Sequence, residues 1–345
     1  MNCTAKQRRS AMKKLKRIFA VFFCLLLASC ILGGCGKAAS SSTPAPSASQ
    51  SGSKPLKIVT TIFPEYDWVR EILGDKADHA EVRMLLDNGV DLHSYQPTAD
   101  DIIKISDCDM FIYVGGESDG WVEDALKEAT NKDMQIINLL DVLGEQVKEE
   151  EVVEGMEAEE EESEDEPEYD EHVWLSLKNA ETLCNAITDA LETIDPANKD
   201  AYAANAASYL EKLAALDGEY QTVVDNTVRK TVLFGDRFPF RYLVDDYGLN
   251  YYAAFVGCSA ETEASFETIS FLSGKVDKLG LPCVLTIEGA QHKIAETIVQ
   301  NTAEKNQSIL TLDSMQSTTS ADAANGTTYL SVMESNLDVL KQALN

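Results

Sequence analysis

The stretch Pro196–Asn226, PANKDAYAANAASYLEKLAALDGEYQTVVDN, decides the fold that we expect. Its apolar side chains recur at alternating steps of four and three, which places them on one face of a helix: Tyr202, Ala206, Tyr209, Leu213, Leu216, Tyr220 and Val223. Asp195-Pro196 marks the start, because proline fits an early helical position. About 30 helical residues span about 45 Å. The stretch therefore predicts a long helix over residues 196–226 that could connect two lobes.

Strands and helices alternate on both sides of this helix. In residues 55–195 the runs that predict strands are Leu56–Phe63, Glu81–Leu86, Met110–Val114 and Met134–Leu139. In residues 227–345 they are Thr231–Phe234, Tyr251–Phe255, Cys283–Ile287 and Ser308–Leu312. Helical patterns follow most of them, and such alternation is typical of parallel sheets. We therefore expect an α/β fold in which two β/α lobes with mainly parallel sheets are joined by one long α-helix.

The N-terminus has the composition of an export signal. Residues 1–34 carry seven basic and no acidic side chains, and their apolar run is too short for a membrane span of about 20 residues. The LGGC at residues 32–35 resembles a bacterial lipobox, so we expect a signal peptide over residues 1–34 and a lipid on Cys35, with Cys30 as the alternative. Residues 35–54, rich in Ser, Ala and Pro, would tether the protein to the cell membrane.

The chain is strongly acidic. Its net charge of −29 argues against nucleic acid or an anionic membrane surface as a partner, since both bind basic patches, and it permits cations. Without residues 1–34 the chain has 22 basic and 58 acidic side chains. Fifteen of the acidic ones lie in residues 149–171, inside an acidic loop that we place at 145–171. By itself, such a run is typical of a solvated, disordered segment.

Four cysteines follow Cys35 in the sequence. Of these, Cys258 and Cys283 each lie near a predicted strand of the same lobe, so they are the first candidate pair for a disulfide. Buried free thiols are the open alternative. No CxxC pair occurs, so a cysteine-based zinc knuckle is not favoured.

Polar side chains that could bind a cation gather where predicted strands end and helices begin. In open α/β sheets, ligands bind beyond the carboxyl ends of the strands. The side chains in such places are His93, His172, Asp236, Glu288 and Asp313. Two imidazoles with two carboxylates could hold a divalent cation. The structural alternative is ordinary, because a lone histidine is more often structural and an aspartate at such an end is often a helix cap.

Five runs of the sequence resemble those of one family. They are IVTTIFP (58–64), DLHSYQPTADDI (91–102), YVGGESDGWVEDAL (113–126), DEHVWLSLKNA (170–180) and GTTYLSVMESNLDVL (326–340). From about Lys57 onward the chain is similar to the substrate-binding lipoproteins of zinc/manganese ABC importers, a class of binding proteins with a long helix between two lobes.

The resemblance implies metal ligands. In that family the histidines of the D-x-H-x-Y-x-P run and of the D-x-H-V-W run bind the metal, and they match His93 and His172. A carboxylate late in the chain is often a further ligand, and it matches Asp313. Zinc-binding members also carry a His- and acid-rich loop at the place of residues 145–171, which could concentrate cations. The loop of this chain has no histidine before His172.

One position departs from the family. The family's third ligand matches Arg237, and arginine cannot bind a cation. Asp236 beside it is the first substitute, and Glu288 and His292 are weaker candidates. The resulting set of two histidines and two carboxylates suits manganese about as well as zinc. We expect zinc first, with manganese as the alternative.

The expected function is metal capture rather than catalysis. The resemblance implies a lipid-anchored, extracytoplasmic solute-binding protein that holds a divalent metal ion between its lobes and delivers it to the membrane permease of an ABC importer. The alternatives are a metal-dependent hydrolase and a surface adhesin with a structural metal site. Against the hydrolase, the motifs HExxH, GxSxG and GxxxxGK[ST] are absent from the sequence.

Overall fold

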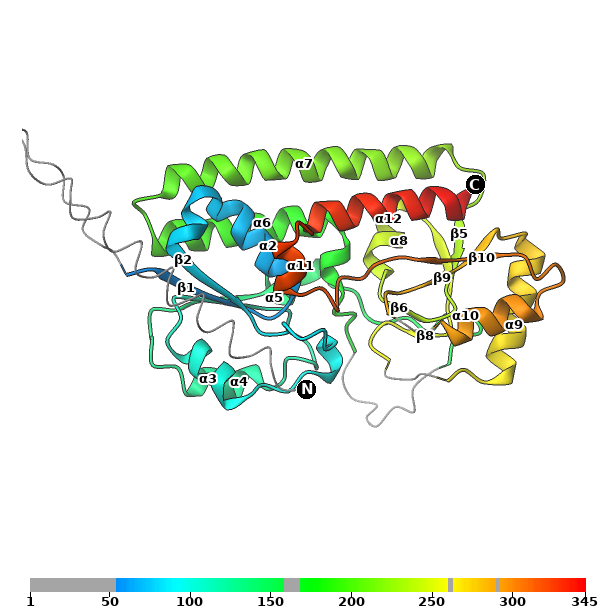
Figure 1. Ribbon diagram of the computed structural model, residues 1–345, viewed down its shortest axis with the longest axis horizontal. Helices are drawn as coiled ribbons and strands as arrows, with labels where there is room; N and C mark the ends of the chain where they lie inside the picture. Colours follow the sequence, from blue (N-terminus) through cyan, green and yellow to red (C-terminus); the bar gives the residue numbers. More distant parts are fainter. Residues whose placement is uncertain (1–53, 158–167, 260–262, 290–291) are drawn as a thin grey trace, which may run out of the picture. The chain divides into compact units, whose positions relative to one another are not determined.

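The N-terminal half is built on a four-stranded parallel sheet, in a computed structural model that describes residues 54–157, 168–259, 263–289 and 292–345. The strand order is β2-β1-β3-β4. The strands are β1 (Leu56–Thr60), β2 (Ala80–Met84), β3 (Met110–Tyr113) and β4 (Gln135–Asn138). Figure 1 shows α3 (Ala99–Ser106) and α4 (Val122–Lys127) on one side of this sheet and α2 (Phe63–Leu73) and α6 (Leu177–Ile194) on the other. The prediction of a parallel β/α sheet is confirmed.

Several predicted features lie outside the described residues. These are the signal peptide (residues 1–34), the lipidated Cys35, the tether apart from Lys54, and the centre of the acidic loop, residues 158–167. Within the part of the chain that the structure describes, no helix has both the length and the hydropathy needed to cross a membrane.

The first strand is shorter than its apolar run. We expect a strand over residues 56–63, but β1 ends at Thr60 and α2 begins at Phe63. The buried carboxylate of Glu65 turns the chain there, because its Oε2 accepts hydrogen bonds from the backbone N–H of Thr61 (2.8 Å) and of Ile62 (3.3 Å). The residues on both sides of this turn are buried, so hydrophobicity alone could not mark the boundary.

Two long antiparallel helices, α6 and α7 (Lys199–Asn226), follow one another in the chain. The predicted start at Pro196 is three residues early, because Asp195 holds a turn before α7. Its Oδ2 accepts hydrogen bonds from Asn198 Nδ2 (2.6 Å) and from the Tyr202 hydroxyl (2.7 Å). Figure 1 shows α7 running past both halves of the chain, and it contacts α2 and α6 of the first and α8 (Arg241–Tyr247) and α12 (Tyr329–Leu344) of the second.

The apolar stripe of α7 is buried almost as predicted. The residues buried along it are Tyr202, Ala206, Tyr209, Leu213, Leu216, Tyr220 and Val224. The expected last member, Val223, is only partly buried. The final step of the stripe is therefore four residues rather than three, which keeps the side chain on the inner face of a helix with 3.6 residues per turn.

The second half contains three pairs of parallel strands. The pairs are β5 (Thr231–Leu233) with β7 (Asn250–Tyr252), β9 (Cys283–Thr286) with β10 (Ser308–Thr311), and β6 (Arg237–Phe238) with β8 (Phe255–Val256). A parallel bridge between Phe234 and Leu285 links the first pair to the second. The predicted strand 251–255 is split into β7 and β8 by the fully buried turn Ala253-Ala254. Figure 1 shows α9 (Phe266–Leu279) and α10 (Lys293–Asn301) against this half.

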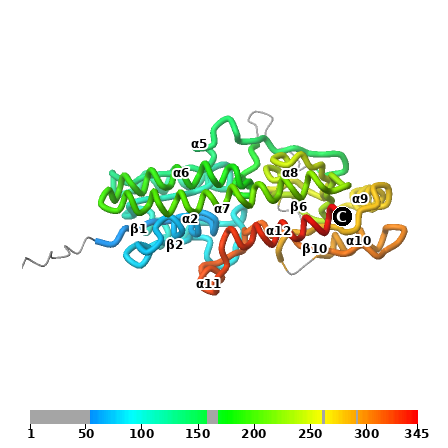
Figure 2. The backbone as a smooth tube through the Cα atoms, turned by 90° about the horizontal axis from the view of Figure 1, so that it is seen from above, coloured from blue at the N-terminus to red at the C-terminus, as the bar shows by residue number. Residues whose placement is uncertain are grey.

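The last helix, α12, connects the two halves. It lies along α7 in both views (Figures 1 and 2). At its start, the Tyr329 N–H donates to Asp67 Oδ2 (2.8 Å) and the Tyr329 hydroxyl donates to the Trp174 carbonyl (2.7 Å). One turn on, the Met333 carbonyl accepts from the Tyr220 hydroxyl of α7 (2.6 Å). These buried bonds tie the C-terminal helix to the N-terminal half.

The proposed disulfide between Cys258 and Cys283 is wrong. All four cysteines of the described residues are free thiols. Cys283 is buried in β9, where it belongs to the core, whereas Cys258 is half-buried in the turn that follows β8. Nearness to two strands of one half does not bring two side chains together, because a disulfide also requires matching Cα separation and direction.

Candidate metal centre

His93 is held in a short 3-10 helix, η2 (Leu92–Ser94). Asp91 caps it, since its Oδ1 accepts from the His93 N–H at 3.0 Å. Leu92 is 1% exposed and anchors the turn in the core. The turn therefore presents the imidazole of His93 in a fixed direction, while the side chain of Leu92 points into the core.

His172 lies at the entrance of a second 3-10 helix, η4 (Val173–Leu175), and is fully buried. Asp170 Oδ1 accepts hydrogen bonds from both the backbone N–H and the Nδ1 of His172, each at 2.9 Å. Trp174, also fully buried, donates its indole N–H to the Ser314 carbonyl (2.9 Å). The short helix is thus fastened to the second half of the chain.

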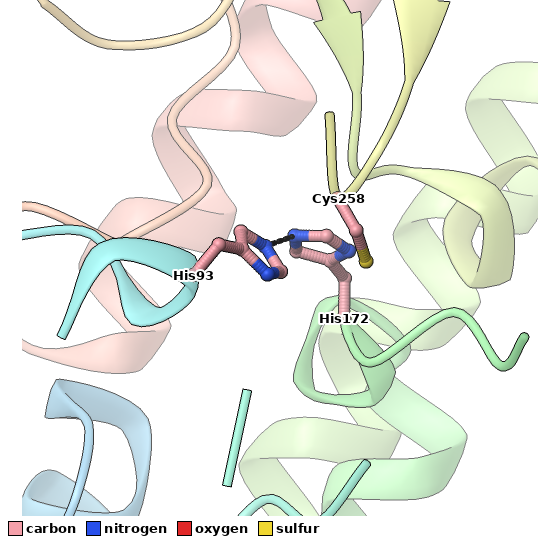
Figure 3. Close-up of side chains that lie close together, drawn as sticks. All are labelled: His93, His172 and Cys258. Carbon is pink, nitrogen blue, oxygen red and sulfur yellow. Dashed lines mark hydrogen bonds between the residues drawn. The ribbon is translucent and has the colours of Figure 1, made fainter. Parts of the chain in front are cut away.

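The two imidazoles face each other through their Nε2 atoms, 3.2 Å apart, as Figure 3 shows. The other nitrogen of each ring is occupied, because His93 Nδ1 is 2.8 Å from Ser118 Oγ and His172 Nδ1 bonds Asp170. Partners of this kind fix ring orientation and leave the opposite nitrogen for a metal. Burial and the neighbouring His172 lower the pKa of His93 to about 3, so its imidazole is neutral, as ligation requires.

Cys258 completes a group of three possible ligands. One ligand atom from each of His93, His172 and Cys258 lies within 4.8 Å of the other two. Among the described residues, this is the group of three or more His, Cys, Asp or Glu side chains that meets this distance. Figure 3 shows the sulfur beside the His172 ring. Burial and the nearby Glu150 raise the pKa of the Cys258 thiol well above its usual value, and the thiol also donates a hydrogen bond to the Glu150 carboxylate.

The glycine before Cys258 allows this approach. A Cβ on Gly257 would lie 2.9 Å from the Phe238 carbonyl oxygen and 3.1 Å from Cε1 and Nδ1 of His172. The Cys258 N–H in turn donates to Glu150 Oε1 (3.1 Å). Backbone of the second half therefore packs directly on the ring of His172.

Arg237 lies next to the site, where it pairs with a carboxylate of the protein. Its guanidinium forms an ion pair with Asp91, the residue that caps the turn of His93. Burial raises the pKa of Asp91, but the charge and hydrogen bond of Arg237 outweigh it, so the pKa lies below its usual value. The pair joins β6 of the second half to η2 of the first, and it keeps the arginine charge compensated beside the imidazoles.

A buried carboxylate, Glu171, lies behind His93. Its Oε1 accepts from the Ser118 N–H (2.9 Å), and its Oε2 is 3.5 Å from His93 Nδ1. Gly116, with φ +80°, makes room for it, because a Cβ there would lie 2.2 Å from Glu171 Oε1. Burial raises the pKa of Glu171. The absence of a side chain at Gly116 thus makes room for the carboxylate that lies behind His93.

The structure gives the predicted carboxylates other partners. Asp236 accepts from the backbone N–H of Arg237 (3.0 Å) and of Ile287 (3.3 Å). Asp313 Oδ1 accepts from the Met315 N–H (2.8 Å). Neither belongs to the three-residue group of His93, His172 and Cys258.

The two weaker candidates also lie outside that group. Both oxygens of Glu288 bind the turn of Ser314 and Gln316, at 2.7 to 2.9 Å, so this carboxylate stabilises a loop. His292 is half-buried at the start of α10, directly after residues 290–291, which the structure does not describe.

The residue missed by sequence reasoning is Cys258. It follows the end of a strand, the same kind of position that identified the histidine and carboxylate candidates. On sequence alone it is interpreted as a disulfide partner or as a buried free thiol, and not as a metal ligand.

The described ends of the acidic loop are anchored to the second half. Glu151 forms an ion pair with Arg241, Glu154 pairs with Lys275 (2.8 Å), and Glu157 Oε1 accepts from the Ser265 N–H (2.5 Å). A small cavity of about 10 Å³ lies beneath this segment, between Glu150, Asp170 and Arg241 among others. The described residues at the N-terminal end of the loop therefore make defined contacts with the second half of the chain.

Comparison with known proteins identifies a family. Residues 58–343 match the model of the zinc-uptake complex component A, periplasmic (ZnuA). The chain is 33% identical to the zinc-binding lipoprotein AdcA of Streptococcus pneumoniae serotype 4 over 83% of this chain and 55% of that protein, so it spans about half the length of this relative. It is 31% identical to the high-affinity zinc uptake system protein ZnuA of Bacillus subtilis, over 96% of this chain and 98% of that protein.

A solved structure shows the same fold. The zinc-bound ZnuA-like domain of Streptococcus pneumoniae AdcA superposes with a TM-score of 0.65 at 30% identity, over 84% of this chain and 99% of that one.

Proposed function

Because this chain belongs to the ZnuA family of periplasmic zinc-uptake components, we propose that it captures Zn²⁺ outside the cytoplasmic membrane and delivers it to the permease of an ABC importer. The names of its relatives, which are zinc-binding and zinc-uptake proteins, support zinc before manganese. In this function the protein binds and releases its ion without catalysis, as a solute-binding protein rather than as a hydrolase or an adhesin.

One observation carries the proposal. His93 and His172 come from distant parts of the chain, yet their Nε2 atoms point at each other across 3.2 Å. Nitrogen ligands around a tetrahedral zinc, each about 2.0–2.1 Å from the metal, are about 3.3 Å apart. Two imidazoles held at this spacing by Ser118 and Asp170 therefore suit a shared zinc ion.

The sequence-based candidates for the remaining ligands are the two predicted carboxylates. Asp236 and Asp313 are both largely shielded from solvent, and burial raises the pKa of each, to about 6 in Asp313. A nearby divalent cation would favour their charged forms. Each accepts backbone hydrogen bonds, so ligation requires an oxygen that can also face the metal.

The proposal includes a lipid anchor. The lipobox-like run before Cys35 supports cleavage there and attachment of the N-terminal cysteine to the cell membrane, with residues 35–54 as the tether. A relative of this chain is named a lipoprotein.

Thermal melting tests the function. The metal-free protein is heated with Zn²⁺, with Mn²⁺ and with EDTA. A ligand that binds only the folded form stabilises it by about 2.7 kcal/mol at one hundred times its dissociation constant, so zinc should raise the midpoint and EDTA should reverse the shift. An unchanged midpoint with every divalent cation would refute the proposal.

A further inference from the structure

We propose that Cys258 is the third protein ligand of this site, and that its thiolate makes the site select zinc over manganese. The inference rests on the proposed zinc-binding function and goes beyond it, since it assigns a ligand where the chain carries Arg237. In this proposal the second half of the chain contributes the sulfur of Cys258 to the metal. The sequence-based expectation for that ligand is Asp236.

The geometry of the three side chains supports this assignment. One ligand atom from each of His93, His172 and Cys258 lies within 4.8 Å of the others. Around a tetrahedral zinc, with Zn–N about 2.0–2.1 Å and Zn–S about 2.3 Å, nitrogen and sulfur ligands are about 3.6 Å apart. The imidazole pair already has the required spacing, so only the sulfur has to approach, by at most about an ångström. Rotation about the Cα–Cβ bond of Cys258 supplies such a movement.

The backbone around Cys258 is fixed against the site. Gly257 packs on the His172 ring at a distance that excludes a side chain, and the Cys258 N–H is bound to Glu150. A cysteine placed in this way needs no loop closure to reach the metal. The thiol is also free, because Cys258 forms no disulfide.

In the metal-free protein, burial and the charges of Glu150, Asp170 and Glu171 raise the pKa of the Cys258 thiol and so disfavour the thiolate. A bound metal cation reverses this effect, because a coordinating thiol loses its proton.

Arg237 is paired with Asp91, so together they add no net charge to the site. Two neutral imidazoles and one thiolate leave a zinc ion with a single positive charge. The carboxylate of Glu171, 3.5 Å from His93 Nδ1, lies where it can compensate that charge through the ring.

The binding step requires no oxidant or reductant. The Sγ–H bond of Cys258 breaks, its proton passes to solvent, and the sulfur electron pair forms the bond to Zn²⁺. Soft thiolate ligands favour zinc, whereas carboxylates and water suit manganese. The third ligand therefore decides which of the two ions the site prefers.

Competition titration of the metal-free, reduced protein against a chromophoric chelator tests the assignment. The variant is Cys258→Ser, and the matched control is Cys283→Ser, a free cysteine in β9. We expect Cys258→Ser to lose at least about 100-fold in zinc affinity, because loss of a residue that only supports a ligand already costs up to about 100-fold. Its loss of Mn²⁺ affinity should be much smaller. Cys283→Ser should bind both ions like the parent.

Two outcomes separate this inference from the function on which it rests. If the parent binds zinc and Cys258→Ser binds it equally well, the ligand assignment is wrong and the zinc-binding function stands. If the parent itself binds no zinc, the proposed function fails.

Cobalt substitution gives a second, folding-independent test on the parent protein. Co²⁺ bound to a thiolate shows a sulfur-to-metal charge-transfer absorption in the near ultraviolet. This band should appear in the parent and in Cys283→Ser and be absent from Cys258→Ser. A parent protein that binds Co²⁺ without the band contradicts sulfur ligation, even if Cys258→Ser does not fold.

Discussion

At the scale of single residues, the site depends on which nitrogen of each imidazole is occupied. Ser118 and Asp170 engage the Nδ1 atoms of His93 and His172, so both Nε2 atoms turn toward the same point. In the metal-free protein one Nε2 carries a hydrogen and donates to the other. Because Asp170 only accepts, His172 holds its hydrogen on Nδ1, and His93 must shift its own to Nδ1, toward Ser118, before both can bind metal.

Removing either imidazole should abolish most of the zinc affinity. His93→Ala or His172→Ala takes away one of the ligands, and we expect a loss of at least about 100-fold. His79→Ala is the matched control, because His79 is exposed at the end of η1 (Gly74–His79), in another part of the chain. Competition titration measures all three variants, and parent-like binding by His93→Ala or His172→Ala would show the histidine assignment to be wrong.

A buried carboxylate makes stability depend on pH. Burial and the charge of Asp119 raise the pKa of Glu65 to about 8, from an ordinary value of 4.5. The folded protein therefore binds this proton more tightly than the unfolded chain does. The resulting stabilisation is fully present below about pH 4.5 and is lost as the pH rises through about 8.

The substitution Glu65→Gln should flatten this dependence. A glutamine can keep the acceptor that caps the Thr61 and Ile62 amides while carrying no charge. Urea unfolding of the metal-free parent at about pH 5 and pH 8 should give a free energy that falls by a few kcal/mol, and in Glu65→Gln by clearly less. Glu267→Gln, in the first turn of α9 and exposed, should behave like the parent.

At the scale of elements, α7 owes its place to one buried face. Most of its stripe was visible in the sequence because a helix repeats every 3.6 residues and the stripe follows that period. Its last member differs, since Val224 is 2% exposed and Val223 is only partly buried. Adjacent valines in one helix share helix propensity, so they isolate the effect of burial.

Val224→Ala should therefore destabilise the protein more than Val223→Ala. Removal of two buried carbons costs about 2 kcal/mol with the cavity that it leaves, and we expect less than half of that at the partly buried position. Urea unfolding curves of the two variants measure the difference. Equal losses would mean that Val223 also lies on the inner face of α7.

At the scale of the whole molecule, one helix packs against both halves. α7 contacts α2 and α6 on one side and α8 and α12 on the other, and Tyr329 and Trp174 add buried hydrogen bonds between the halves. The Arg237–Asp91 ion pair joins them again beside the histidines. Large hinge rotation would break these contacts.

Zinc binding should consequently change the molecule little. Small-angle X-ray scattering of the metal-free and zinc-loaded protein should give nearly equal radii of gyration. A clear decrease in the radius of gyration on zinc addition would show wide closure of the two halves. It would contradict the expectation that α7 holds them in a fixed arrangement.

The sequence by itself determined the features that depend on local periodicity. It predicted the alternation of strands and helices and most of the buried stripe of α7. The resemblance to a family of binding proteins indicated His93 and His172. Strand ends such as Thr60 were missed, because a buried turn is as apolar as the strand before it.

Only the tertiary structure decided which distant side chains meet. It separated Cys258 from Cys283, placed Cys258 against His172, and turned Arg237 toward Asp91. Neither Asp236 nor Asp313 lies in the group that holds the histidines. Backbone amides of β6 and of the residue after β9 bind the oxygens of Asp236, and an amide of the loop after β10 binds Asp313. Periodicity fixes the face on which a side chain lies, whereas the partner across that face depends on how separate segments pack.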